Sequence, residues 1–248
     1  DRLFVEIGSQ PGAGGKSGRH EPPFVRISFD DPHDLGGQFF LWEFATAVAG
    51  HLLKINPFDQ PDVESTKNKT KDILSAAGDE AGSAGPVHAP TAEKVRVAGP
   101  APSARPDSAL SKLLGSRRDG DYIALLAFLP RRPAVEELLS GLAAGLRIKT
   151  GLPVTVGFGP RYLHSTGQLH KGDGNRGLFL VLVASDLPEV GIPAVKGIAR
   201  PAKGFKALFE AQAEGDARAL AEKGRRILTI ELAGPAEEAL ASLSSVLE

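Results

Sequence analysis

This chain has 248 residues, enough for one large domain or two modest ones, each with a buried core. Its 29 basic and 30 acidic side chains give a net charge of −1, so neither nucleic acid nor an anionic membrane is expected as a partner. Cysteine is absent, which excludes disulfides and thiol chemistry, and no apolar run approaches the roughly 20 residues that span a bilayer, so we expect a cytoplasmic protein.

Two short strands and a loop rich in glycine and proline are predicted before the first helix. Residues 3–7 have a strand-like composition, and residues 24–29 alternate apolar and polar side chains with the period of two that a strand requires. Residues 8–17 of this loop end in Gly-Lys-Ser, which suggests a phosphate-binding loop, but the glycine needed five residues before Gly15 is replaced by Gln10. We therefore interpret this segment as a surface loop. Methionine is absent even at position 1, so we expect a fragment or a processed piece.

Residues 34–53 are predicted to form a long helix that is apolar on most of its faces, with Asp34 as its N-cap. A helix of this kind is ordinarily buried in a core or against a partner, so we expect it to be covered. Prolines within residues 56–61 end the helix and stiffen the turn, after which residues 63–74 are predicted to form a second, polar helix. The apolar residues of the first helix are Phe39, Phe40, Trp42, Phe44, Ala47, Val48, Leu52 and Leu53.

Residues 75–106 consist mainly of alanine, glycine, serine and proline with scattered charges. Such a composition cannot bury enough apolar surface to offset the entropy lost on ordering the chain. We predict a flexible linker or insertion, with a brief edge strand at residues 94–97.

The C-terminal part, residues 107–248, is predicted to be an α+β domain. The order of its elements is βαββαβ with a terminal helix, which fits a ferredoxin-like half. A continuation of one parallel α/β sheet is the alternative. The strands are expected at residues 122–129, 154–158, 177–183 and 226–232, and the helices at residues 133–148, 205–223 and 235–247.

Residues 50–67 resemble the C-terminal signature of phosphoglucose isomerases. In that family a Phe-Asp-Gln turn precedes a Val-Glu pair, and a lysine follows three residues after the glutamate. The same pattern occurs here, with Gln60 ending the turn and Lys67 as the lysine. Residues 161–172 and 205–230 are similar to segments of proteins in which transaldolase is fused to this isomerase.

The resemblance implies that residues 1–74 are the C-terminal part of a sugar-isomerase (SIS-like) α/β domain. It implies interconversion of glucose 6-phosphate and fructose 6-phosphate by ring opening and enediol proton transfer, without a cofactor. It assigns ring opening to Lys67 and a substrate-holding role near the phosphate to Gln60. Spacing alone favours a solvated lysine instead. Asp62 stands where the family usually has a small residue, which adds a charge next to the site.

His164, Gln168, His170 and Lys171 form a second candidate cluster. Residues 168–172 are similar to a Gln-Leu-Ile-His-Gln-Gly segment of the isomerases, whose histidine assists ring opening, although they lack one residue and follow the lysine motif. The similarity makes His170 a second catalytic candidate and the other three substrate-binding candidates. A polar surface loop or a structural histidine is the alternative. No metal site is expected, because neither cysteine nor a carboxylate cluster completes a coordination shell.

The family takes its carboxylate base and its phosphate-holding loops from sequence upstream of the lysine motif, and the residues before Asp34 are too few to supply them. We therefore expect an upstream portion of the same protein or a second subunit to complete a sugar-phosphate site. A sugar-phosphate-binding or assembly module without turnover is the alternative.

Overall fold

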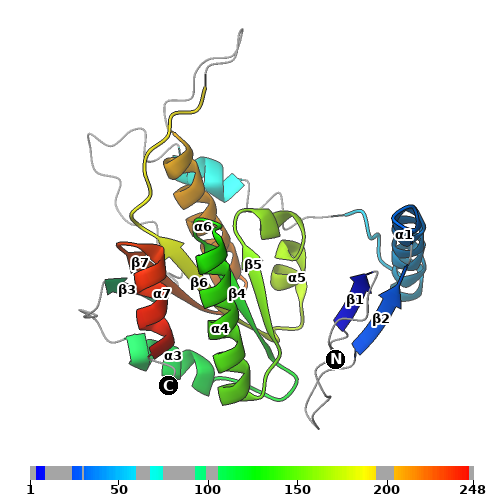
Figure 1. Ribbon diagram of the computed structural model, residues 1–248, viewed down its shortest axis with the longest axis horizontal. Coiled ribbons are helices and arrows are strands. Elements are labelled where there is room, and N and C mark those ends of the chain that lie inside the picture. Colours follow the sequence, from blue (N-terminus) through cyan, green and yellow to red (C-terminus); the bar gives the residue numbers. More distant parts are fainter. Residues whose placement is uncertain are drawn as a thin grey trace. The chain divides into compact units, whose positions relative to one another are not determined.

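The computed structural model separates into two compact units, Asp1–Gln60 and Pro61–Glu248 (Figure 1). Each unit carries its own sheet of parallel strands, so the chain is a mixed α/β protein. Within the described residues, no helix is both long and apolar enough to cross a membrane. The residues that the structure describes are 4–8, 24–29, 31–59, 68–74, 93–98, 106–193 and 204–245.

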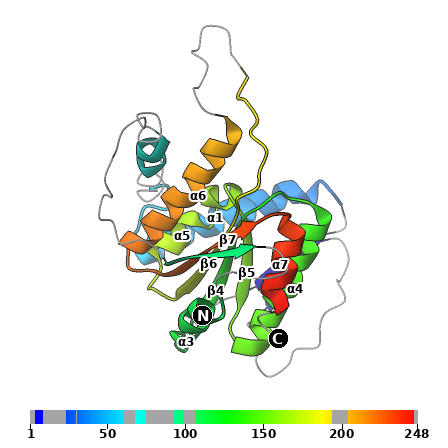
Figure 2. The same cartoon turned by 90° about the vertical axis from the view of Figure 1, so that its left-hand side faces the viewer.

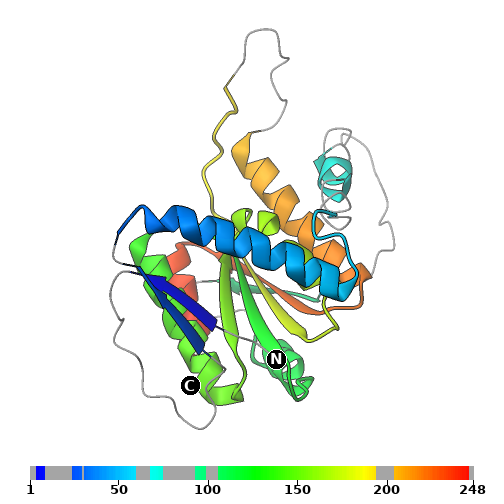
Figure 3. The ribbon, with the colours of Figure 1, turned by 90° about the vertical axis from the view of Figure 1, so that its right-hand side faces the viewer.

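In its described residues, the first unit consists of a two-stranded sheet and one long helix. β1 (Phe4–Gly8) and β2 (Phe24–Ser28) pair in parallel, and the Arg26 guanidinium donates to the Glu6 carboxylate at 2.8 Å across the pair. α1 (Asp34–Leu53) follows as one continuous helix (Figure 3). Its N-cap is His33 rather than Asp34, which is instead the first helical residue.

The apolar side chains of α1 are exposed, so burial in a core of this chain is not observed, and cover by a partner stays a prediction. Phe40 leaves 70% of its surface accessible and Leu52 leaves 73%. Gly50 is the one buried residue of α1. The described residues of the first unit therefore offer this helix no core, and an apolar surface of this kind ordinarily marks a site of contact.

The second unit is built on a five-stranded sheet in which every strand is parallel to its neighbours, in the order β3-β7-β6-β4-β5. The ferredoxin-like βαββαβ arrangement requires antiparallel neighbours and is wrong; the parallel alternative forms instead. The reason lies in residues 159–176, which are long enough for a crossover and fold into two short helices. The strands are β3 (Glu93–Ala98), β4 (Tyr122–Phe128), β5 (Val154–Phe158), β6 (Gly177–Ala184) and β7 (Arg226–Ala233).

Helices cover both faces of this sheet (Figures 1 and 2). α3, α4 and α7 pack against the face that carries Leu228 and Ile230 of β7. α6 and the short helix η1 pack against the opposite face, which carries Tyr122 and Leu126 of β4. β4 is buried along its whole length, as is typical of a strand covered on both faces. The helices are α3 (Pro106–Gly115), α4 (Pro133–Thr150), η1 (Arg161–His164), α5 (Gly167–Gly172), α6 (Phe205–Glu222) and α7 (Ala236–Ser245).

β3 lies at one edge of the sheet, which confirms the edge strand predicted at residues 94–97. The remainder of the predicted linker, up to residue 105, lies outside the described residues. The helix of residues 68–74 lies in the second unit, whereas the sequence grouped it with the first.

A buried ion pair joins the residue before β4 to the start of β7. The Asp121 carboxylate accepts two hydrogen bonds from Arg226, at 2.6 and 3.0 Å, and one from the Arg118 amide at 2.6 Å. Burial by itself would raise the pKa of Asp121, but the hydrogen bonds and charges of Arg226 and Arg118 together outweigh it and hold that pKa below its ordinary value. The charged form of Asp121 therefore stabilises the folded state.

Replacing Asp121 with alanine is expected to lower the free energy of unfolding by about 3–5 kcal/mol, because it leaves the Arg226 charge without its partner. Urea unfolding followed by circular dichroism measures the loss, and Asp119→Ala, at an exposed neighbouring position, serves as the control. The contribution of Asp121 is present above its unfolded pKa of about 3.9 and is lost as the pH falls through the lower folded pKa. Equal unfolding midpoints for the two variants would contradict this role.

Candidate functional site

The turn that opens the isomerase-like motif is built by hydrogen bonds of its own backbone and side chains. Lys54 adopts a left-handed conformation with φ of 56°, and the Ile55 amide donates to a carbonyl in the last turn of α1 at 3.0 Å. The Asn56 side-chain oxygen then accepts from the Phe58 amide at 3.0 Å, and the Asp59 amide donates to the Asn56 carbonyl at 3.3 Å. The first half of the motif thus has a shape set by its local sequence.

Gly50 is required by the close approach of this turn to α1. A Cβ at residue 50 would lie 2.9 Å from Cδ of Pro57, a separation that side chains do not adopt. The glycine at the start of the motif therefore lets Pro57 pack directly on the helix.

The residues that the resemblance assigns to the chemistry, Gln60 and Lys67, lie outside the described residues. The chain is described again as the helix of residues 68–74, which lies beside α6 (Figure 2). Lys69 forms an ion pair with Glu222 of α6. Thr70 packs closely on Gly215 of the same helix, because a Cβ on Gly215 would lie only 2.8 Å from the Thr70 hydroxyl oxygen. The helix that follows the motif is therefore anchored on α6.

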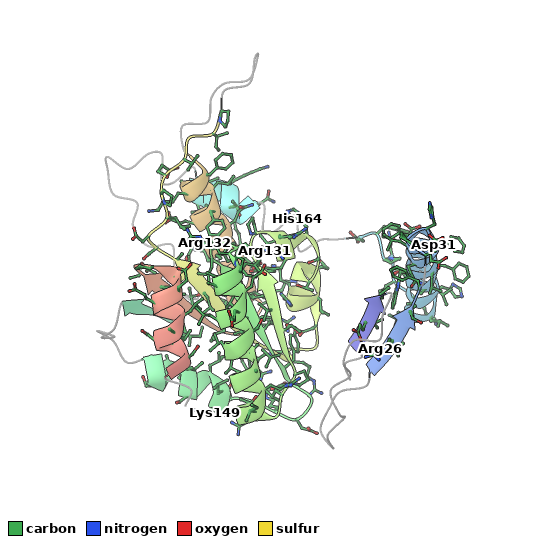
Figure 4. The ribbon with its side chains drawn as sticks, viewed as in Figure 1. Arg26, Asp31, Arg131, Arg132, Lys149 and His164 are labelled. Carbon is green, nitrogen blue, oxygen red and sulfur yellow. The ribbon has the colours of Figure 1, made fainter. Side chains whose placement is uncertain are left out.

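The second predicted cluster divides between the surface and the interior. His164, at the end of η1, is exposed (Figure 4), and Gln168 is half-buried. His170 and Lys171 of α5 are both buried. The four side chains therefore do not share one surface on which a substrate could contact all of them.

Lys171 has its partner inside the protein. Its ammonium pairs with the Asp216 carboxylate of α6 and donates to the Gly167 carbonyl at 3.3 Å, and the Tyr162 hydroxyl donates to the other Asp216 oxygen at 2.5 Å. Burial raises the pKa of Tyr162 well above its ordinary value, and the charge and hydrogen bond of Asp216 raise it further, so the hydroxyl remains a donor. These contacts fasten η1 and α5 to α6.

His170 packs between two aromatic rings, with ring centroids 5.8 Å from Tyr162 and 5.2 Å from Phe179. This environment favours the structural role that the sequence left open beside the catalytic one. Sequence reasoning missed Asp216, the residue on which the cluster depends. A single carboxylate between Gly215 and Ala217, on the buried side of an alanine-rich helix, was the available signal.

A cavity of about 450 Å³ lies where β4, β6 and β7 end, the edge at which parallel sheets ordinarily bind ligands. Its cations are Arg132 and Lys206. Each has a carboxylate neighbour, Glu237 at 3.2 Å and Glu210 at 3.9 Å. The cavity therefore offers an apolar floor with balanced charges rather than a concentrated site for a phosphate.

Comparison with known proteins gives partial matches to one kind of enzyme. A stretch of 50 residues, 20% of the chain, is 46% identical to the glucose-6-phosphate isomerase of Exiguobacterium sibiricum and covers 11% of it. A stretch of 61 residues is 41% identical to the glucose-6-phosphate isomerase of Streptococcus pyogenes serotype M18 and covers 14% of it. No protein-family model matches the chain. The chain is thus locally similar to these isomerases and spans a small part of their length.

Among solved structures, a hypothetical protein from Thermus thermophilus aligns with 57% of this chain and 37% of its own. The TM-score is 0.50 and the sequence identity is 21%. A likeness at this identity concerns the fold alone, and it agrees with a mixed α/β architecture.

Asp216→Ala is expected to lower the free energy of unfolding by about 3–5 kcal/mol, because it leaves the Lys171 ammonium buried without a counter-charge. Adding Lys171→Met should restore much of the loss, since two apolar side chains then replace the pair. Denaturant unfolding of both variants measures this, with His164→Ala as the exposed control. Additive losses in the double variant would show that the two groups do not act as a pair.

Proposed function

We propose that this chain is part of an aldose–ketose isomerase that interconverts glucose 6-phosphate and fructose 6-phosphate. The observation that carries the proposal is local identity of 46% and 41% with two glucose-6-phosphate isomerases. The chain covers between 11% and 14% of those relatives, so the activity is assigned to a larger assembly that contains it.

In this proposal Lys67 supplies the amine for ring opening. It donates a proton to the ring oxygen as the bond from that oxygen to C1 breaks, while the C1 hydroxyl gives up its proton to water and becomes the aldehyde oxygen. Gln60 holds the substrate near its phosphate. A carboxylate base outside these residues then moves a proton between C2 and C1 through an enediol. Because the proton taken from one carbon is returned to the other, the reaction needs no redox cofactor.

The finer assignments belong to the same proposal. Residues 1–74 are the C-terminal part of a sugar-isomerase (SIS-like) domain, and the parent protein is of the type fused to transaldolase and acts in the cytoplasm. His164 and Gln168 remain proposed substrate contacts. For His170 and Lys171, the buried aromatic and ionic contacts support a positioning role behind the surface.

The exposure of the first unit supports the need for a second surface. A two-stranded sheet is marginal by itself, and parallel sheets are ordinarily covered on both faces. Val5, Ile7 and Val25 of this sheet are exposed, as are Phe40 and the other aromatic side chains of α1. Burying each large apolar side chain contributes about 1.5–3 kcal/mol. We propose that an upstream portion of the same protein or a second subunit, carrying the base, covers this unit.

Lys67→Ala in the complete assembly is expected to reduce kcat by about 10²–10⁴-fold, the range that a positioned acid or base contributes. A coupled assay for fructose 6-phosphate measures turnover. Lys71→Ala, four residues along at an exposed position, is the matched control and should retain activity. Unchanged turnover in the Lys67 variant would remove that residue from the mechanism.

A sugar-phosphate-binding or assembly module without turnover is the alternative, favoured by the exposed α1. The same assay on the chain alone separates the two. Robust turnover by these 248 residues would exclude the module and would also show that no external base is needed.

The chain alone is expected to bind the fluorescent probe 8-anilinonaphthalene-1-sulfonate at α1, since Phe40 and Phe44 stack with ring centroids 6.2 Å apart on its exposed surface. Phe40→Ser combined with Phe44→Ser should remove most of the fluorescence. Ile148→Ser, which changes an exposed apolar side chain of α4, is the control. Equal fluorescence in all three proteins would place the exposed apolar surface elsewhere.

A further inference from the structure

A second cavity of about 450 Å³ lies on the α6 face of the sheet. Its floor is formed by β6 and β7, one wall by α6, and another by Ile73 and Leu74 of the helix of residues 68–74. It therefore differs from the cavity at the strand ends, and none of the residues proposed for the isomerase chemistry is among the described residues that line it.

Thr229 of β7 places a buried hydroxyl at this cavity. The residue is 3% exposed, and among the described residues its hydroxyl oxygen has no hydrogen-bond partner. Its neighbours Leu228 and Ile230 belong to the core on the opposite face, so the alternation of the strand turns Thr229 toward α6. A buried hydroxyl without a partner costs about 1–3 kcal/mol, which a ligand with a hydrogen-bonding group would recover.

The rest of the lining combines aliphatic walls with groups that accept hydrogen bonds. Alanines of α6 and Val183 of β6 supply the apolar surface. The Ser185 hydroxyl donates to a carbonyl at 3.2 Å, which leaves its oxygen able to accept. The charged lining residues are Glu210, Glu214, Glu231 and Arg218.

This lining matches one class of ligand. Aliphatic walls suit the C–H faces of a sugar ring or cyclitol, and hydroxyl and carboxylate oxygens suit its hydroxyl groups. Arg218 donates to Glu214 at 2.9 Å, so the cation of the lining is already paired. Among the described lining residues, carboxylates thus outnumber guanidinium groups, which disfavours a phosphorylated ligand.

We propose that this cavity binds a small, unphosphorylated, polyhydroxylated ligand of about one sugar ring. The Thr229 hydroxyl exchanges a hydrogen bond with a ligand hydroxyl at the cavity floor. The site goes beyond the proposed isomerase function and does not rest on it, because it is argued only from described residues to which that function assigns no role.

Thermal unfolding of the chain with D-glucose, myo-inositol or D-glucose 6-phosphate tests the site. The two neutral probes should raise Tm saturably, and the phosphorylated probe should raise it less. Thr229→Val keeps the side-chain shape and removes the hydroxyl, so Tm without ligand should rise while the affinity for the neutral probes falls at least about tenfold. Thr155→Val of β5, outside the cavity, is the matched control and should retain the ligand effect.

The comparison of Thr229→Val with the parent removes the general stabilisation that sugars give to any protein, since both variants share it. Identical probe-dependent shifts in the two proteins would overturn the proposal, and so would the absence of a saturable shift in the parent. Putrescine, a diamine, is a further probe. If it raises Tm and the neutral polyols do not, the ligand is an amine and the proposal is overturned. Lys67→Ala should leave every ligand-induced change in Tm unaltered. A negative result in this test can therefore be told apart from a negative result in the isomerase test.

Discussion

Parallel pairing of the five strands is the constraint on which the second unit depends. Each parallel strand must be followed by a crossover, so the chain returns through helices that bury both faces of β4. The carboxyl ends of β4, β6 and β7 then meet at one edge, where a cavity forms, and α6 is laid across the face that holds Thr229. Both cavities therefore depend on the parallel orientation of the strands.

Ion pairs with buried carboxylates hold segments that the sheet itself does not fix. Arg226 fastens Asp121 before the start of β4, and Asp216 fastens Lys171 in the crossover between β5 and β6. Apolar side chains of similar volume could give equal stability at such places. We infer that the pairs specify the position in which these connections pack, because any other packing would leave a buried charge without its partner.

The regular elements follow from sequence wherever periodicity is strong. β4, β6, α4 and α7 carry clear apolar patterns, and their predicted ranges agree closely with the observed ones. Residues 159–176 are polar and rich in glycine, so their pattern does not predict the two short helices observed there. These helices make the connection a crossover between parallel strands, whereas the predicted βαββαβ order implies a hairpin. The candidate sites followed the same rule. The shape of the turn at residues 56–59 is local and predictable, whereas the importance of Thr229 or Asp216 depends on what packs around them in three dimensions.

β1 and β2 each have one neighbour within the described residues, so the outer edge of each strand presents backbone amides and carbonyls in a repeating row. A polypeptide that adds a strand at one of these edges would bind through these main-chain groups. Recognition through main-chain groups does not depend on which side chains are present. Such an association would therefore persist through many substitutions on both surfaces, provided that the geometry of the edge is kept.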